Sequence, residues 1–542
     1  MAPAGSKPPT IGALALLIAA CLPLFFVGLG ALGLSEPDEP YYALPALEMV
    51  RSGNLAITTF GGEPWFDKPI LFYWVVAAGY ATLGVSEGAS RVGSALAALA
   101  GVLAIYLHAR RARPRAALLS ALALATMLEY AIVARLAITD MTLTLFVTLG
   151  MLASARYLSS GRLRAAALAG ASFGLAALTK GPVGLLLPAV ALAAYAVLAR
   201  RRDLMRPAAI GACALGALAT AGPWYGTMLL RHPDLLLGSF LGHGNLGRLV
   251  RPEHPSFPLY YLAILVVGAL PWTGALPAAI ASAASRPGRA AERGAGRAPG
   301  PLFALCWLGA VLAVFSVVAS KLPSYLLPAL PAAALLIGGF WTDSLSGARE
   351  GGPARAARLS AWAGVAIAAL VAVALVVAPR DDEWGPAARF APLASAALVL
   401  GALAALVAVR RRSLRGLAIA NAAVSISIVL LLVYAAMPAL ERLDSMRPFA
   451  RALRDRGAAG SVEGVFGVRE RFGLDFYLDR SLPRLDDERA LAERVRAAPG
   501  GVWIVWERDA ERVLSLPGVA GETVYSDGDL AAVRLEPLEP AR

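Results

Sequence analysis

Residues Ile70 to Gly84 read ILFYWVVAAGYATLG, an apolar and aromatic stretch that invites interpretation as a membrane-spanning helix. As an α-helix, a stretch of about 15 residues extends about 22 Å, whereas the hydrocarbon core of a bilayer is about 30 Å thick. We therefore interpret the stretch as an interfacial or re-entrant helix that does not cross the membrane. This interpretation matters for topology, because counting the stretch as a span would move every later segment to the opposite side of the membrane.

The composition of the rest of the chain is that of a polytopic membrane protein. Of the 542 residues, 58% are hydrophobic and only 16% are charged, against about 25% in soluble domains. The net charge of +13 lies largely in arginine clusters within short loops, which indicates membrane orientation rather than a nucleic-acid partner. The three cysteines lie inside apolar segments, so no disulfide framework is expected.

Thirteen apolar segments remain when residues 70–84 are set aside. The arginine clusters separate the later ones in pairs, and the positive-inside rule places these clusters in the cytoplasm. The first segment is too long for a signal-peptide core and lacks a cleavage site, so we expect a retained anchor with a cytoplasmic N-terminus. The predicted spans are 11–34, 91–109, 116–134, 141–158, 164–179, 183–199, 207–229, 258–283, 301–319, 324–342, 358–379, 391–409 and 414–437.

The character of the chain changes after residue 437. Short β-branched runs at Val462–Phe466, Gly501–Trp506 and Ala531–Leu535 predict strands, and Asp444–Arg456 and Asp486–Ala497 predict helices with polar faces. We therefore expect a transmembrane domain over residues 1–437 and a small soluble α/β domain over residues 438–542. The loops at 285–300 and 346–357 are expected to be flexible.

Short charged motifs gather at the predicted outer ends of the spans, in the loops 35–90 and 230–257 and in the tight turns. They are Asp38-Glu39, Asp67-Lys68, Thr139-Asp140-Met141, Thr179-Lys180-Gly181-Pro182 and Lys321-Leu322-Pro323-Ser324-Tyr325. Each has a structural alternative: the acids can form a solvated loop, Lys68 can snorkel to the headgroups, and Asp140 can cap a helix. Lys180 is the least expected, because a tight turn needs the following glycine and proline but no lysine.

These charges together predict a site for an anionic lipid phosphate on the outer face, because lysines suit phosphate as compact point charges. Three of the four histidines, His232, His243 and His254, share the loop 230–257. Their spacing matches no compact zinc motif. His243 is the best single ligand candidate, with Asp67 or Asp38 as its partner.

The order and spacing of these motifs resemble those of the GT-C glycosyltransferases that use polyprenyl-phosphate sugars. Within that group the chain is most similar to the bacterial lipid A aminoarabinose transferases and to the protein O-mannosyltransferase superfamily. The resemblance covers nearly the whole chain. Besides the motifs above, it is carried by Glu36-Pro37, Pro40-Tyr41-Tyr42-Ala43, Glu48-Met49, Phe66, Pro69, Tyr73-Trp74, Leu83-Gly84, Arg91, Leu178, His243, Arg248, Pro328 and Phe476-Tyr477-Leu478.

The resemblance implies a multi-pass protein of the bacterial inner membrane, with a periplasmic active site and a periplasmic C-terminal domain. The residues that match the family motifs are catalytic candidates Asp38, Glu39 and Asp140, donor-phosphate candidates Lys68, Lys180, Arg248, Lys321, Tyr325 and Tyr42, and ligands Asp67 and His243 for a divalent metal ion such as Zn²⁺. Two positions depart from the family pattern. Tyr41-Tyr42 stands where Arg-Tyr is common, and Asp67 stands where glutamate is usual, so the sugar and the acceptor stay open.

The implied reaction moves a sugar, such as 4-amino-4-deoxy-L-arabinose, from undecaprenyl phosphate to lipid A or a related envelope acceptor, with inversion. The implied partners are this donor, this acceptor and membrane lipids. Alternatives within the enzyme class are a protein O-mannosyltransferase-like enzyme or one that acts on another envelope polymer. A lipid flippase or transporter, or a non-catalytic lipid-binding relative, is a more distant alternative, because the charges lie at span ends and no internal repeat is present.

Overall fold

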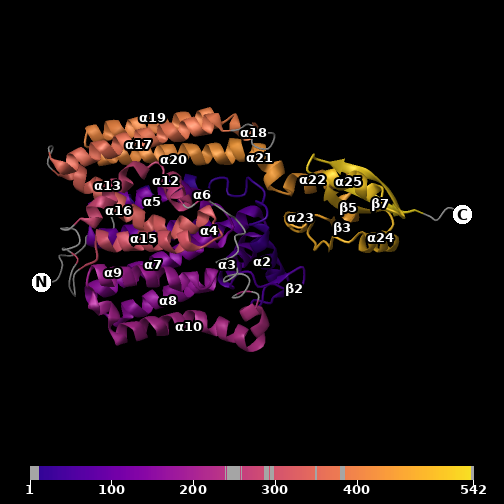
Figure 1. Ribbon diagram of the computed structural model, residues 1–542, viewed down its shortest axis with the longest axis horizontal. Coiled ribbons are helices and arrows are strands. Elements are labelled where there is room, and N and C mark those ends of the chain that lie inside the picture. The colour runs from indigo at the N-terminus through magenta and orange to yellow at the C-terminus, as the bar shows by residue number, and fades with distance from the viewer. Residues whose placement is uncertain are drawn as a thin grey trace.

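Most of the chain forms long apolar helices that lie side by side, and a mixed α/β domain follows at one end of this bundle (Figure 1). The computed structural model describes residues 11–238, 240, 257, 259–285, 292, 298–347, 351–378 and 385–538. The helices of the bundle are α1 (Ile11–Cys21), η1 (Leu22–Phe26), α4 (Glu87–Ala112), α5 (Ala117–Thr126), α6 (Leu128–Val133), α7 (Thr139–Ser160), α8 (Leu163–Lys180), α9 (Val183–Leu198), η2 (Arg202–Met205), α10 (Pro207–Arg231), α12 (Tyr260–Gly268), η4 (Thr273–Ala275), α13 (Leu276–Ala284), α15 (Pro301–Val317), η5 (Pro323–Ala329), α16 (Leu330–Ser346), α17 (Gly352–Val377), α18 (Gly385–Ala388), α19 (Ala391–Arg410), α20 (Leu414–Leu431), η6 (Leu432–Ala436) and α21 (Met437–Asp444).

The predicted spans coincide with helices, but many of these helices are short or broken. By length and hydropathy, six helices in the described ranges are able to cross a membrane, or seven if a pair bent by 117° counts as one span. The count of thirteen is therefore not reproduced by this criterion. The predicted span 116–134, for example, breaks at Met127 into α5 and α6. Apolar sequence identifies the segment, but it does not keep the helix straight.

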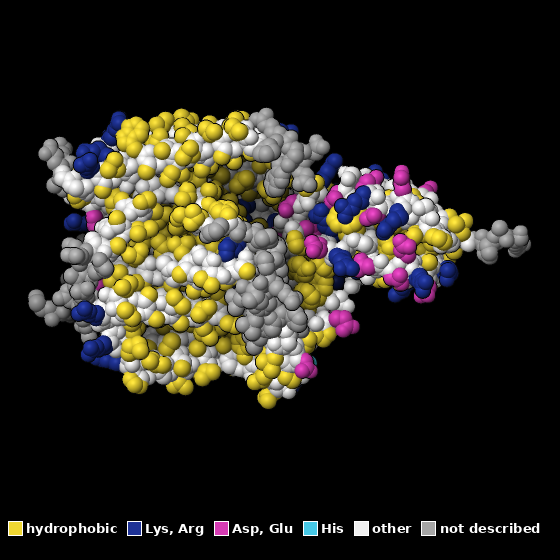
Figure 2. All heavy atoms as spheres, in the orientation of Figure 1, with side chains coloured by type: hydrophobic (Ala, Val, Ile, Leu, Met, Phe, Trp, Pro, Cys, Tyr) yellow, Lys and Arg dark blue, Asp and Glu magenta, His cyan; other side chains and the backbone are white. Residues whose placement is uncertain are grey.

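The two ends of the bundle differ in charge. Apolar side chains cover the bundle between its ends, as expected of a multi-pass membrane protein. The end away from the α/β domain shows mainly lysine and arginine side chains, whereas basic and acidic side chains are mixed on that domain (Figure 2). This distribution agrees with the arginine clusters that oriented the predicted spans.

The segment between the first two long helices folds against the end of the bundle nearest the α/β domain. It contains α2 (Pro40–Ser52), the hairpin of β1 (Thr59–Phe60) and β2 (Glu63–Pro64), and α3 (Leu71–Leu83). Glu48 holds the hairpin, because its carboxylate accepts hydrogen bonds from the backbone N–H groups of Gly61 and Gly62. The stretch expected to be a short interfacial or re-entrant helix is thus the 13-residue helix α3, too short to span the hydrocarbon core.

A buried ion pair anchors this segment. The carboxylate of Glu39, 1% exposed, accepts hydrogen bonds from Arg91 Nε at 2.8 Å and Arg91 Nη2 at 2.5 Å. The same carboxylate accepts the backbone N–H groups of Ser35 and Ala137. Arg91 also donates to the carbonyl oxygens of residues 29, 32 and 33. The pair therefore joins the segment to α4 and to the turn that precedes α7.

The α/β domain is built around a five-stranded sheet in the order β4-β3-β5-β7-β6. Strands β3, β4 and β5 are parallel to one another, and β7 runs antiparallel to β5 and β6. The predictions of strands at 462–466 and 501–506 are confirmed. The elements are α22 (Arg447–Asp455), η7 (Ala459–Ser461), β3 (Val462–Phe466), α23 (Gly473–Leu478), β4 (Arg484–Leu485), α24 (Glu488–Ala497), β5 (Gly501–Trp506), α25 (Glu507–Leu514), β6 (Val519–Ser526) and β7 (Leu530–Pro537).

Both faces of this sheet are covered by helices. In β5, Val502 and Ile504 belong to one apolar cluster, which includes residues of α22 and α23. Trp503 and Val505 belong to another, which includes residues of α24 and α25. This alternation follows from the two-residue repeat of a strand. The last helix of the bundle continues to Asp444, beyond the boundary expected at residue 437, and leads directly into α22.

The domain docks on the segment that follows the first helix. The Tyr477 hydroxyl accepts the N–H of Leu34 at 2.7 Å. Glu36 accepts the N–H of Gly473 at 2.5 Å. Burial raises the pKa of Glu36 to about 8, and this effect outweighs the opposing influence of the Gly473 N–H and of the nearby Arg471. The contact therefore favours a neutral carboxyl group.

Arg91→Ala should destabilise the protein by about 3–5 kcal/mol, because it leaves the Glu39 carboxylate buried without its cation. Thermal unfolding of the purified protein measures the loss. The matched control is Arg51→Ala, which removes the exposed ion pair with Asp479 and should cost less than about 1 kcal/mol. Equal unfolding temperatures for the two variants would contradict the role of the buried pair.

The pKa of Glu36 predicts a pH dependence of stability. The folded protein holds this proton more tightly than the unfolded chain, whose pKa is near 4.5. The contribution of Glu36 is therefore complete below about pH 4.5 and decreases as the pH rises to about 8. The unfolding temperature of the wild type should fall over this window relative to that of Glu36→Gln, whose side chain stays neutral. Parallel curves for the two proteins would refute the prediction.

Candidate active site

A cavity of about 540 Å³ opens where the first segment, the ends of the bundle helices and the α/β domain meet. Its lining comes from five parts of the chain that lie far apart in sequence. The lining residues are Pro37, Asp38, Tyr41, Tyr42, Trp65, Asp67, Lys68, Ile138, Asp140, Lys180, Leu322, Ser324, Tyr325 and Glu470. Most of the residues that the sequence singled out are therefore brought together in one place.

Two neighbouring helix ends place a lysine beside an aspartate in this cavity. Helix α8 ends at Lys180, because Gly181 follows with a positive φ of 81°. Helix α7 begins at Thr139 and carries Asp140 in its first turn. Lys180 Nζ donates to Asp140 Oδ1 at 2.6 Å. Each charge also lies at the helix end whose dipole favours it.

Tyr325 completes this half of the site. The ammonium group of Lys180 lies 4.5 Å from the centroid of the Tyr325 ring, within cation–π distance. Tyr325 belongs to η5, the turn that leads into α16. The aspartate and the ring together hold the lysine ammonium at the cavity wall.

A second lysine–aspartate pair, just before α3, lines the same cavity. Lys68 Nζ donates to Asp67 Oδ2 at 2.5 Å and, more weakly, to the Asp67 carbonyl oxygen at 3.4 Å. Tyr42 lies beside this pair, packed against Phe72 and Tyr73. Burial, and then the charge of Asp67, raise the pKa of Tyr42 well above its ordinary value, so its hydroxyl group stays protonated.

Aromatic side chains form the wall nearest the α/β domain. The ring of Tyr41 stacks on Trp65, with 5.7 Å between centroids and 7° between planes. On another side it contacts Phe472 of the α/β domain at 4.8 Å. Two residues before Phe472, the exposed Glu470 lines the cavity. The α/β domain therefore contributes an acidic group to the site.

Two predicted site residues lie outside the cavity lining. Glu39 directs its carboxylate to Arg91 and to backbone N–H groups, as described above. Lys321 donates to the carbonyl oxygens of Ser316 and Val318 at the end of α15. Both side chains bind groups of the protein itself. We therefore assign them the role of holding the neighbouring segments in position. Arg248 and His243 lie outside the described residues.

The described residues do not test the predicted metal ion, because the predicted ligand His243 lies outside them. Among the residues that the structure describes, no three His, Cys, Asp or Glu side chains are grouped closely enough to hold a metal. The other predicted ligand, Asp67, lies against the ammonium group of Lys68. The divalent metal stays a prediction, and the proposed reaction does not depend on it.

Trp65, Ser324 and Glu470 also line the cavity, although their sequence positions were not expected to belong to the site. Ser324 lay within the quoted Lys321–Tyr325 motif, and Trp65 lies two residues before Asp67, so closeness to the charged motifs could have identified both. Glu470 had no such signal, because nothing local in residues 466–473 connects it to a segment about 400 residues earlier.

The fold is shared with known membrane glycosyltransferases. The chain superimposes on the crystal structure of ArnT from Cupriavidus metallidurans bound to undecaprenyl phosphate with a TM-score of 0.80, at 24% identity, over 97% of this chain and 98% of that one. Residues 67–226 match the family described as dolichyl-phosphate-mannose-protein mannosyltransferase. The predicted class, a helical GT-C membrane fold with a small C-terminal α/β domain, is confirmed.

Sequence comparison identifies the family within this class. The chain is 30% identical to the undecaprenyl phosphate-α-4-amino-4-deoxy-L-arabinose arabinosyl transferase of Aeromonas salmonicida, over 67% of each chain. It is 34% identical to a transferase of the same description from Pseudomonas fluorescens, over 62% of this chain and 60% of that protein. The chain belongs to the family of these arabinosyl transferases. The matches span about 60% of the length of the first relatives.

Proposed function

We propose that the protein transfers 4-amino-4-deoxy-L-arabinose from undecaprenyl phosphate to lipid A or a related envelope acceptor. The observation that carries this proposal is the pair of lysine ammonium groups, Lys68 and Lys180, in one cavity at the bundle end that also bears the α/β domain. The names of the relatives supply the sugar and its lipid carrier. We place the protein in the bacterial inner membrane, with a cytoplasmic N-terminus and the cavity facing the periplasm.

The lysines act on the leaving group. Cleavage of the bond between the sugar and the carrier leaves undecaprenyl phosphate with an additional negative charge. Ammonium groups placed in advance stabilise that charge as it develops in the transition state. Asp67 and Asp140 hold the two ammonium groups in position, and Arg248 is a further candidate cation. Tyr42 and Tyr325 supply neutral hydroxyl donors beside the phosphate position.

The acceptor attacks the anomeric carbon from the side opposite the phosphate, which inverts the configuration. A phosphate acceptor, as in lipid A, is already a nucleophile and needs no strong base. A hydroxyl acceptor requires a base, and Asp38, one of the carboxylates that line the cavity, is our candidate for that role. Asp38 follows Pro37 directly, so the anchored segment around Glu39 controls its position.

Incubation of the purified protein with undecaprenyl-phosphate sugars and lipid A, followed by mass spectrometry, tests the function. The expected product is lipid A with an added aminopentose. Transfer only to a peptide would favour the protein O-mannosyltransferase-like alternative, and transfer only to another envelope polymer would favour an enzyme acting on that polymer. Movement of the donor across vesicles without any product would favour a flippase.

Lys68→Ala and Lys180→Ala should each lower transfer by about 10²–10³-fold, because each removes a charge that stabilises the leaving phosphate. Arg51→Ala is the control, since Arg51 is an exposed cation that pairs with Asp479 and does not line the cavity. Its transfer per folded protein should stay close to that of the wild type. Wild-type rates in both lysine variants would exclude the donor-phosphate assignment, and an equal loss in Arg51→Ala would show that the effect is not specific to the cavity lysines.

We infer that Glu470, which lines the cavity, recognises the amino group of the proposed sugar. It is exposed in the cavity, and among the described side chains no ion pair to it is present. Glu470→Gln should therefore weaken use of the aminosugar donor by about 10–100-fold, since a hydrogen bond between charged groups contributes about 1.5–3 kcal/mol. Competition between amino- and N-formylated donors measures this. A variant with unchanged preference between the two donors would show that Glu470 does not contact the amino group.

A further inference from the structure

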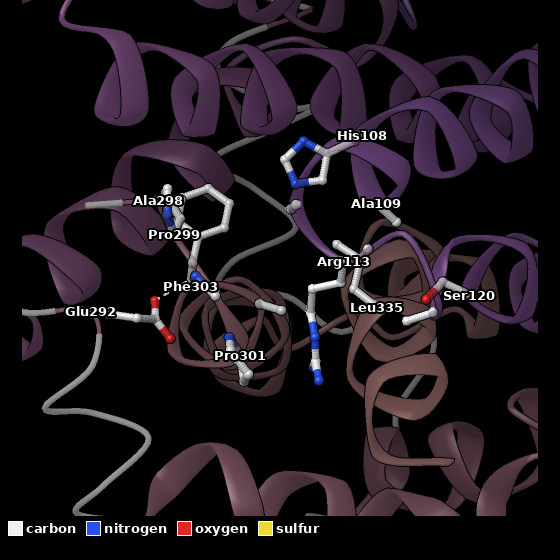
Figure 3. Close-up of a pocket in the computed structure, with 14 residues that line it drawn as sticks. His108, Ala109, Arg113, Ser120, Glu292, Ala298, Pro299, Pro301, Phe303 and Leu335 are labelled. Atoms are coloured by element: carbon white, nitrogen blue, oxygen red, sulfur yellow. Dashed lines mark hydrogen bonds between the residues drawn. The ribbon is translucent and has the colours of Figure 1, made fainter. Parts of the chain in front are cut away.

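Two cavities with charged linings lie in the described part of the bundle end away from the candidate active site. One, of about 300 Å³, lies between the α4–α5 turn and the start of α15 (Figure 3). Its two charged lining side chains already have partners. Glu292 accepts the N–H groups of Gly300 and Leu302 and so caps α15. Arg113 pairs with Asp343 of α16. This cavity therefore offers no convergent set of like charges to a ligand.

The second cavity, of about 420 Å³, has a different lining. It lies between the end of α16, the start of α17 and the end of α19, and four arginines line it: Arg358, Arg410, Arg411 and Arg412. No acidic residue of the described chain lines it. The volume is within the range of about 300–1,000 Å³ that is usual for ligand pockets. We call it the arginine cavity.

The arginine cavity lies on the opposite face of the membrane from the active site. Helix α16 begins next to Tyr325 in the active-site cavity and ends at Ser346, beside the arginine cavity. A helix of this length, 17 residues, extends about 25 Å. The two cavities are therefore separated by nearly the thickness of the hydrocarbon core.

The positive-inside rule accounts for arginines at this end, but it does not account for their convergence. Topology requires only that cationic side chains reach water. Here α17 supplies Arg358 and the end of α19 with its following turn supplies Arg410, Arg411 and Arg412, all to one cavity. Arg412 adopts a left-handed backbone conformation, with φ of 55°, which is unfavourable for a residue with a side chain. Its guanidinium donates to the carbonyl oxygens of Leu345 and Gly347, so it fixes the turn that carries Arg410 and Arg411.

The surroundings of the cavity fit a lipid. Apolar side chains on the outer surface of α17 and α19 continue away from it, with Leu359 60%, Trp362 50% and Val407 46% exposed. Arg410 lies 5.6 Å from the ring of Trp362, an arrangement typical of the membrane interface. A ligand with an anionic head and acyl chains would satisfy both the arginines and this surface. A small soluble anion would satisfy the arginines alone.

We propose that the arginine cavity binds the phosphate headgroup of an anionic phospholipid, in the leaflet that faces away from the active site. Guanidinium groups bind phosphate oxygens through paired hydrogen bonds, and basic pockets between membrane helices suit such headgroups. The acyl chains lie along α17 and α19. Arg412 positions the turn, and Arg358, Arg410 and Arg411 contact the phosphate. This site is independent of the transfer reaction proposed above.

Native mass spectrometry of the full-length protein in neutral detergent tests the site, with dioleoylphosphatidylglycerol and dioleoylphosphatidylcholine as probes. We expect one tightly held phosphatidylglycerol and no comparable phosphatidylcholine. The variant R358Q/R410Q/R411Q should bind phosphatidylglycerol about 100-fold more weakly, because it removes three charges and keeps Arg412. The matched control, R162Q/R164Q/R202Q, removes three exposed arginines elsewhere on the same face and should bind like the wild type.

Three results would overturn the proposal: an equal loss in the control variant, equal binding of phosphatidylcholine, or displacement of the lipid by inorganic phosphate at the same concentration as by phosphatidylglycerol. The first would show that general surface charge attracts the lipid, and the last would assign the cavity to a soluble anion. If the triple variant does not fold, as judged by size-exclusion chromatography, R358Q replaces it. Unchanged lipid affinity in a folded R358Q protein would likewise overturn the proposal.

Discussion

The site depends on one buried interaction, the ion pair between Arg91 and Glu39. Burying two charges costs free energy that their attraction offsets only when nearly all their hydrogen-bonding groups are satisfied. Here the carboxylate receives two guanidinium bonds and two backbone N–H groups, and the guanidinium also reaches three carbonyl groups. Because these partners come from α4, the first loop and the turn before α7, the pair positions Asp38 and Asp140 together.

Outside this ion pair, the charged residues of the site are positioned by the ends of helices. Lys180 at the end of α8 and Asp140 at the start of α7 meet because the two helices are antiparallel neighbours. At the other end of the bundle, α17 and the turn after α19 supply the arginines that line one cavity beside the end of α16. Between these ends most helix side chains are apolar, since unpaired charge inside the hydrocarbon core is costly; the buried Glu129 of α6 is an exception. Both proposed binding sites therefore lie at helix ends, where charged side chains reach the surface of the membrane.

Much of the architecture was predictable from local pattern. The apolar segments, the interfacial length of residues 70–84 and the strands at 462–466 and 501–506 follow from hydropathy and from the strand repeat. The number of unbroken spans did not follow, because breaks such as the one at Met127 depend on neighbouring helices. In the site, Asp38, Asp67, Lys68, Asp140 and Lys180 were found from their place at span ends.

The sequence by itself determined the membrane class, the order of the segments and the chemical kind of the site, since charge and hydropathy are properties of each residue and its near neighbours. Only the tertiary structure decided which charges face the cavity. It directed Glu39 to Arg91 and Lys321 to backbone carbonyl groups, and it brought Glu470 from the α/β domain to the cavity wall. The physical reason is that a buried charged side chain points toward the groups that stabilise its charge. Those groups come from distant parts of the chain, so the local sequence does not reveal them.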